Sequence, residues 1–304
     1  MMASFRFLIG AATVMATVLL VVGFFGSWHA SLDALSHFRH FLIIAVFVGG
    51  VTSAAVGLVR LTAFSIVAIV AALVLSFPHL PFVAPSVETI GGLRIVQFNV
   101  KIHNARQDEA VNWIIAQKPD VVLLQEFDPL NHPGFLGLAK DLPFEVRCKS
   151  RGLGYVVIRS RHQLLAQHCS DGESFAWAQI AVQGRRVTFA SLHLAWPWPF
   201  KQAEQLENLR EAFVAMPKPV VLAGDFNATP WSAVVGQIED MTGTKAVGGF
   251  RISLWLDVFH SGKPWPALPI DHVLLPKDAH LKSIGTGPFL GSDHLPVIAE
   301  FALN

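Results

Sequence analysis

The sequence predicts an α/β domain attached to a group of membrane-spanning helices. Two observations support this: apolar residues concentrate before residue 80, and after it short apolar strands alternate with amphipathic helices. The 304 residues are 52% hydrophobic with a mean hydropathy of +0.47, which is too apolar for an ordinary soluble domain. We therefore expect a membrane anchor at 1–80, a linker at 81–90 and a globular domain at 91–304.

Three apolar stretches within the first 80 residues carry almost no charge. They are 7–26, 41–59 and 61–80. About 20 apolar residues cross the hydrocarbon core of a bilayer, so about three transmembrane helices fit. Arg6 before the first stretch is typical of a signal peptide, but the two later stretches would keep the chain in the membrane in any case.

The orientation of these helices depends on few charges. Arg6 and Arg60 lie at the same end of the predicted bundle, and the positive-inside rule places them in the cytoplasm. The segment 28–40 and the globular domain then lie outside. In a bacterium, the domain would face the periplasm from the inner (plasma) membrane.

Polar residues stand at one end of six predicted strands. Four strands, at 93–98, 121–124, 187–192 and 220–223, are followed by Asn99, Glu126, His193 and Asp225. Two strands, at 273–275 and 297–299, are instead preceded by Asp271 and by Asp293-His294. If these two run in the opposite sense, all six polar ends meet at one edge of the sheets. The helices that connect the strands are expected at 108–117 and 201–216.

Asn227 follows Asp225 by two residues. On extended chain their side chains would leave the same face and converge on one small ligand. The alternative is an Asx turn, which an isolated Asp-x-Asn string forms more often. Because other strands also end in polar residues, we favour a ligand-binding site over an isolated turn.

The motifs that carry these residues resemble the endonuclease/exonuclease/phosphatase superfamily. They are QFNV at 97–100, LLQEF at 123–127, SLHL at 191–194, AGDFNATPW at 223–231, IDHVLL at 270–275 and GSDHLP at 291–296. The hydrophobic anchor in front is similar to that of a membrane-anchored bacterial branch of the family. The resemblance implies a four-layer α/β sandwich, in which two mixed β-sheets are flanked by helices, and metal-dependent hydrolysis of phosphate esters.

The resemblance also implies the metal ligands. Glu126 would be the main ligand of Mg²⁺ or Mn²⁺, which prefer oxygen donors. Asn99 would support this carboxylate, and Asp293 would be a second acidic ligand. Lys101 departs from the family pattern, because many relatives, notably abasic-site nucleases, carry an Asp there. A cation at this position repels a second metal or contacts phosphate itself, which argues against two metals and against abasic-site specificity.

The same resemblance assigns the catalytic residues. Asp225 would orient and deprotonate the attacking water, and Asn227 would donate its amide to a phosphate oxygen. His193 and His294 would contact the reacting phosphate, and Asp271 would hold His294 in one tautomer.

Three other features leave alternatives open. Tyr155 matches the tyrosine of the family in position, or it is a core residue of its strand. Trp196 and Trp198 stack on a base or enter the membrane interface, or they belong to a proline-stiffened loop. Cys148 and Cys169 form a disulfide or are two buried thiols.

We therefore expect a membrane-anchored, divalent-metal-dependent phosphodiesterase or nuclease whose substrate is a nucleic acid or a lipid head group. The formal net charge of +1 disfavours long duplex DNA. One alternative is a phosphate-binding or interaction protein with this fold but without turnover. Another is a zinc hydrolase that uses His193, His272 and His294.

Overall fold

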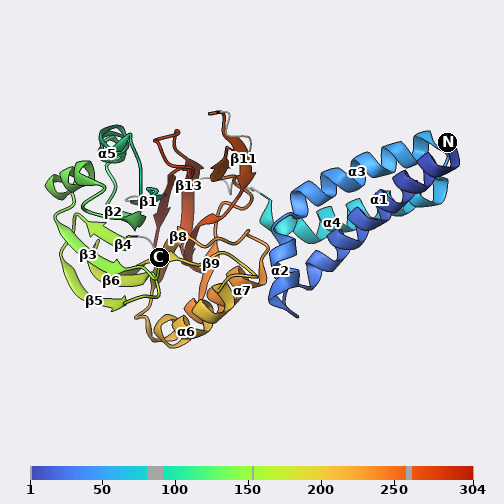
Figure 1. Cartoon of the computed structure of the whole chain (residues 1–304). Coiled ribbons are helices and arrows are strands. Elements are labelled where there is room, and N and C mark those ends of the chain that lie inside the picture. The colour runs from blue at the N-terminus through green and yellow to red at the C-terminus, as the bar shows by residue number, and fades with distance from the viewer. Residues whose placement is uncertain (1, 81–91, 153, 258–261, 304) are drawn as a thin grey trace.

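The chain folds into an elongated helical bundle beside a sandwich of two β-sheets (Figure 1). The computed structural model describes residues 2–80, 92–152, 154–257 and 262–303, so the predicted linker at 81–90 lies outside the described residues. The helices of the bundle are α1 (Met2–Val22), η1 (Gly23–Phe25), α2 (Ala30–Ser36), α3 (Arg39–Ala55), α4 (Val59–Ser76) and η2 (Phe77–His79).

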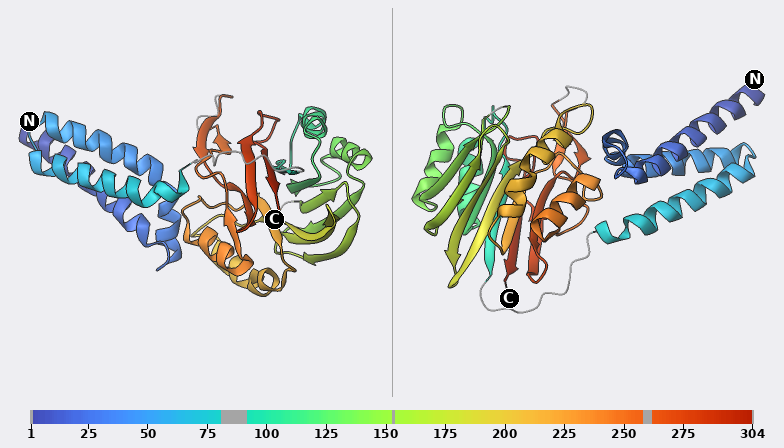
Figure 2. Two further views of the ribbon diagram at one scale, coloured as in Figure 1. Left: turned by 180° about the vertical axis from the view of Figure 1, so that it is seen from behind. Right: turned by 90° about the horizontal axis from the view of Figure 1, so that it is seen from below.

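Two segments of the bundle, Met2–Phe25 and Val59–His79, are long and apolar enough to cross a membrane. A third crossing results if α2 and α3, which meet at a bend of 65°, are counted together. Helices α1, α3 and α4 run side by side (Figure 2), and Leu20, Val46 and Ala72 form their shared core. Many large apolar side chains on the outside are exposed, as expected of a surface that contacts lipid.

The sandwich contains two six-stranded sheets of mixed direction. The first has the order β13 (His280–Thr286), β14 (Val297–Ala302), β1 (Leu93–Asn99), β2 (Val121–Phe127), β4 (Tyr155–Ser160), β3 (Phe144–Lys149). The second has the order β5 (Leu164–Ser170), β6 (Phe175–Val182), β7 (Arg185–His193), β8 (Val220–Asp225), β12 (Asp271–Pro276), β9 (Thr244–Ala246). The pairs β1–β2 and β7–β8 are parallel, and the others are antiparallel. The strands β10 (Leu254–Leu256) and β11 (Trp265–Leu268) pair antiparallel in a small two-stranded sheet.

Three apolar clusters define four layers. The inner cluster lies between the sheets and takes side chains such as Ile95 and Phe189 from both. The outer face of the first sheet packs on α5 (Gln107–Ala116) and η3 (Pro133–Lys140). The outer face of the second packs on α6 (Gln202–Ala215) and α7 (Ala233–Thr242). The predicted four-layer α/β sandwich behind a set of apolar helices is thus confirmed.

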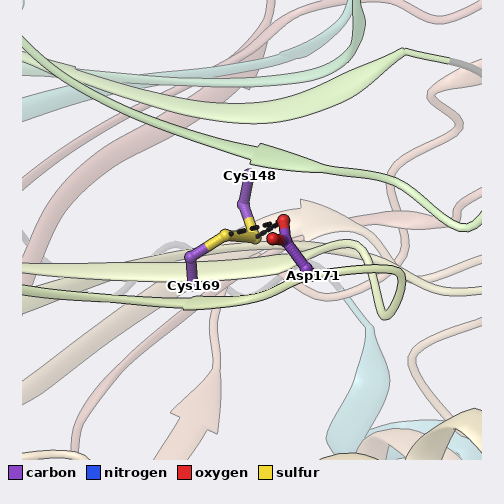
Figure 3. Close-up of side chains that lie close together, drawn as sticks. All are labelled: Cys148, Cys169 and Asp171. Atoms are coloured by element: carbon purple, nitrogen blue, oxygen red, sulfur yellow. Dashed lines mark hydrogen bonds between the residues drawn. A yellow bond between two sulfur atoms is a disulfide. The ribbon is translucent and has the colours of Figure 1, made fainter.

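The two cysteines form a disulfide bond between the sheets (Figure 3). Cys148 lies on β3 and Cys169 on β5, which are edge strands of the two sheets, and their Cα atoms are 5.4 Å apart. The Asp171 carboxylate lies 3.3 Å from the Cys169 sulfur. Because a thiolate is the form of cysteine that binds metal, the bonded pair and Asp171 make no metal site.

Candidate active site

Asn99 holds two carboxylates from different sheets together. It ends β1, and its Nδ2 donates to Glu126 Oε1 at 3.1 Å and to Asp225 Oδ2 at 3.0 Å. The second oxygen of Glu126 accepts from the backbone N–H of Ile102 at 3.3 Å. β1 and β2 are parallel, so their polar ends lie at one edge, as the sequence pattern predicts.

His193 faces the same two carboxylates. It is paired with Asp225 in the register of the parallel strands β7 and β8. Its Nε2 lies 3.5 Å from Asp225 Oδ2 and 3.9 Å from Glu126 Oε1. The imidazole is partly exposed, so it borders both the carboxylates and solvent.

His294 forms a buried ion pair at the inner side of the site. Its Nδ1 donates to Asp271 Oδ2 at 2.7 Å, and its Nε2 lies 3.7 Å from Asp225 Oδ2. Burial opposes a charge on His294, but the carboxylates of Asp271 and Asp225 outweigh burial and raise its pKa to about 10. His294 is therefore an imidazolium at neutral pH.

Asp225 is almost completely buried, and burial raises its pKa despite the nearby His294. Its Oδ1 accepts from the backbone N–H of Asn227 at 2.9 Å. This is the Asx turn, and Asn227 has a φ of 46°, so the expectation of extended chain at these two residues is wrong. The Asn227 Nδ2 donates to Leu194 O at 2.8 Å, while its buried Oδ1 has no partner among the described residues.

Asp293 lies at the rim and points to a cation. Its Oδ2 is 3.2 Å from Lys101 Nζ, and both side chains are partly exposed. Lys101 has a φ of 56°, which turns the chain after β1 toward Asp293. The structure therefore brings Asp293 to Lys101, whereas Glu126 and Asp225 share Asn99. The metal role of Asp293 stays a prediction.

His272 is separated from the other two histidines that a zinc site would need. Its Nε2 donates to Ala228 O at 2.7 Å, and its ring packs edge-on against Phe226 at 5.2 Å. Asp271, its neighbour on β12, points to His294 on the opposite face. This arrangement disfavours the zinc alternative.

The carboxylates fit a hard divalent cation. Asp225, Asp271 and His294 place ligand atoms within 4.8 Å of one another, but all three are buried, and the last two are already paired. Glu126 is more accessible, because it lines a groove of about 390 Å³ together with His193 and Asn227. Oxygen donors at the floor of an open groove suit Mg²⁺ or Mn²⁺ better than softer metals.

Aromatic residues form the outer wall of this groove. Trp196 and Phe200 line it, and on their other side they enclose a cavity of about 180 Å³ with Ala34 and Phe38 of the bundle. Trp198 borders the same cavity and is 55% exposed. The loop therefore lies between the groove and the end of the helical bundle. Tyr155, by contrast, packs against the outer cluster of the first sheet.

A layer of buried amides supports the site, and sequence reasoning missed it. Gln97 Nε2 donates to Asp271 Oδ1 and to Gln125 Oε1, each at 2.8 Å. Gln125 in turn donates to Ser191 Oγ at 3.0 Å. The sequence did contain a signal for this layer. Gln97 lies two residues before Asn99, and Ser191 lies two residues before His193, so each pair shares one face of an otherwise apolar strand.

The model of the Endonuclease/Exonuclease/phosphatase family matches residues 96–294, which contain the first five motifs and the sixth as far as His294. The chain belongs to this family. Its members are phosphoesterase hydrolases, so this family membership confirms the coarse chemistry that the motifs predict. No curated protein sequence matches the chain.

Solved structures with the endonuclease/exonuclease/phosphatase fold resemble the sandwich. TDP2 of D. rerio, complexed with a single-strand DNA product, is 18% identical, with a TM-score of 0.55 over 70% of this chain and 99% of that one. A family protein of Bacteroides vulgatus is 15% identical, with a TM-score of 0.57 over 70% of this chain and 100% of that one. Sphingomyelinase C of Streptomyces griseocarneus is 17% identical, with a TM-score of 0.52 and the same two coverages. At these identities the likeness shows the fold alone.

Proposed function

We propose that the chain is a membrane-anchored, divalent-metal-dependent hydrolase of phosphate esters, of the phosphodiesterase or nuclease type. One observation carries this proposal: six polar side chains from six separate motifs form one connected network at a groove. They are Asn99, Glu126, His193, Asp225, Asp271 and His294.

In this proposal, Glu126 holds Mg²⁺ or Mn²⁺, with Asn99 keeping its carboxylate in place and Asp293 as a second ligand. The bound cation would neutralise charge on the phosphate oxygens and the leaving group. Lys101 lies where a second cation would be repelled, so we propose a single metal. Asn227 lines the groove, and the second N–H of its amide, beside the one that donates to Leu194 O, would donate to a phosphate oxygen.

Asp225 is the proposed base for the attacking water. Its raised pKa makes the carboxylate a better proton acceptor. Its Oδ2 lies 3.5 Å from Nε2 of His193, which lines the groove. His294 would place a positive charge beside the pentavalent phosphorus, and Asp271 keeps that imidazole charged and oriented. These groups act together on an in-line displacement.

We propose further that residues 1–80 anchor a domain at 91–304 on the periplasmic side of a bacterial inner membrane. The apolar length of α1 and α4 supports the anchoring. The contacts of α2 with the sandwich support the proposal that the segment 28–40 and the sandwich share one side of the membrane. The Cys148–Cys169 disulfide supports an oxidising compartment outside the cytoplasm.

Hydrolysis of bis-(p-nitrophenyl) phosphate by the full chain in detergent micelles tests the function. We expect turnover with Mg²⁺ or Mn²⁺, its loss in EDTA, and a rate lowered about 10²- to 10⁴-fold by Asp225→Asn. The matched control is Asp240→Asn, an exposed carboxylate on α7. Activity that survives chelation or the Asp225 substitution contradicts the proposal. Phosphate binding without turnover would support the non-enzymatic alternative.

The substrate class is tested at the aromatic wall of the groove. Trp196→Ala and Trp198→Ala are assayed on phospholipid vesicles and on single-stranded oligonucleotides. A loss confined to vesicles favours a lipid head group, and a loss confined to oligonucleotides favours stacking on a base. Unchanged rates on both substrates would show that the loop serves only packing.

A further inference from the structure

The segment between α1 and α3 contacts the loop that follows the proposed base. This loop, 226–232, leads from Asp225 to α7. The indole Nε1 of Trp231 donates to the backbone oxygen of Ser36 at the end of α2, at 2.7 Å. The guanidinium of Arg39, which begins α3, lies 5.3 Å from the centre of the Trp231 ring. In Figure 1, α2 lies directly beside α7.

Asp33 is the centre of this contact. It comes from α2 and is only 4% exposed. One of its carboxylate oxygens accepts from Ser232 Oγ at 2.6 Å, and the other accepts from the backbone N–H of Ala233 at 2.8 Å. The N–H of Val234 lies 3.4 Å from the first oxygen. The first N–H groups of a helix have no partner within the helix and carry partial positive charge. Ser232 is the N-cap of α7, because its own Oγ accepts from the Val234 N–H at 3.1 Å, and Asp33 adds a charged acceptor to this cap from about 200 residues away in the sequence.

The same loop is held by the sandwich on its other side. Gln202 Nε2 of α6 donates to the backbone oxygens of Phe226 and Asn227, each at 3.1 Å. The N–H of Phe226 donates to Ile270 O at 3.0 Å. The loop is thus clamped between the sandwich and α2, and Asp33 provides the charged contact on the α2 side.

We propose that Asp33 is a positioning residue for the hydrolase. By capping α7 from the membrane anchor, it fixes the loop 226–232 and with it Asn227 and the Asx turn on Asp225. The site is complete only while α2 is docked on the sandwich. This docking also holds the groove at a set position relative to the bilayer. The catalytic part of this inference depends on the proposed function, and the docking part does not.

Two measurements on the full chain in detergent micelles test the inference. Hydrogen exchange reports on the amides of 231–236, and steady-state kinetics on bis-(p-nitrophenyl) phosphate with Mg²⁺ report on the site. For Asp33→Ala we expect faster exchange in 231–236, with the inner strands unchanged. We expect kcat to fall about tenfold or more while KM changes less than about twofold, because misplaced groups cost mainly kcat.

Two matched variants provide the controls. Asp240→Ala removes an exposed carboxylate from α7 itself and should change neither measurement. Asp33→Asn keeps one oxygen that accepts from Ala233, so it should recover part of both losses. If Asp33→Ala does not fold, Trp231→Phe replaces it, because this variant removes the indole hydrogen bond to Ser36 and keeps an aromatic ring beside Phe250 and Arg39.

The outcomes separate the two proposals. Faster exchange in 231–236 together with the loss of kcat supports the inference. Unchanged exchange in Asp33→Ala, or in Trp231→Phe where that variant is used, overturns the docking. Faster exchange with unchanged kcat overturns the positioning role. A wild-type chain without turnover overturns the proposed function, and the exchange measurement still decides whether Asp33 fixes the loop.

Discussion

Acid should destabilise this fold through His272, and His272→Gln tests it. His272 is 3% exposed on β12, and burial lowers its pKa from 6.5 to about 4. The hydrogen bond to Ala228 O favours the charged ring but only partly offsets burial. Glutamine is chosen because its amide can donate to the same oxygen and does not titrate.

The direction of the effect follows from proton uptake. Between pH 6.5 and about 4 the unfolded chain holds a proton on His272 that the folded chain lacks. The free energy of unfolding therefore falls as the pH drops through this window. Above pH 6.5 the protonation of His272 no longer lowers it. A pKa lowered from 6.5 to about 4 corresponds to roughly 3 kcal/mol at most.

Urea unfolding of the full chain in micelles, followed by tryptophan fluorescence at pH 7.5, 6.0 and 4.5, measures this. Other buried histidines such as His132 add to the acid sensitivity of the wild type, so the quantity of interest is the difference from His272→Gln. We expect the variant to be less stable at pH 7.5 and the difference to shrink by roughly 2 to 3 kcal/mol at pH 4.5. A difference that is constant with pH would refute the argument.

Two further substitutions test the strands and the ion pair that build the site. A Cβ on Gly224 would lie 1.9 Å from Leu192 O, so Gly224→Ala should push β7 and β8 apart. We expect the thermal midpoint of unfolding to fall by about 10 °C or more. Gly236→Ala is the control and should not lower the midpoint, because a Cβ on Gly236 would meet no atom within 4 Å. Asp271→Asn removes the carboxylate that raises the pKa of His294, so the alkaline limb of the pH–rate profile should move to lower pH; an unmoved limb counts against a cationic His294.

The sequence was most informative about the strands that carry the site. Asn99 ends β1, Glu126 is the last residue but one of the parallel strand β2, and Asp271 begins a strand antiparallel to β8, directly opposite Asp225. Apolar runs with polar ends therefore placed these groups at one edge, because the direction of each strand fixes the edge at which its end lies. The bounds of the edge strands β3 and β5 were not predicted, because many of their side chains are exposed, which weakens the apolar signal.

Local pattern could not predict how loops turn or what they touch. Asn227 takes a left-handed conformation because the Asp225 carboxylate binds its N–H, a choice that competes with extended chain at every Asp-x-Asn string. Lys101 and Asp293 are distant in sequence and meet only through the packing of two loops. Asp33 gave no signal beyond a charge between apolar segments, since its partners belong to α7.

The buried amides explain why the polar ends form one network rather than separate surface groups. Between the sheets the core is apolar, so an amide placed there must find partners or lose the free energy of its desolvation. Gln97 lies on the inner side of β1 and reaches Asp271 on the other sheet, which aligns the two sheets at this edge. His294 Nδ1 then donates to the remaining oxygen of Asp271. The geometry of the proposed catalytic groups is therefore fixed by the hydrogen bonds that the buried amides of Gln97 and Gln125 donate beneath them.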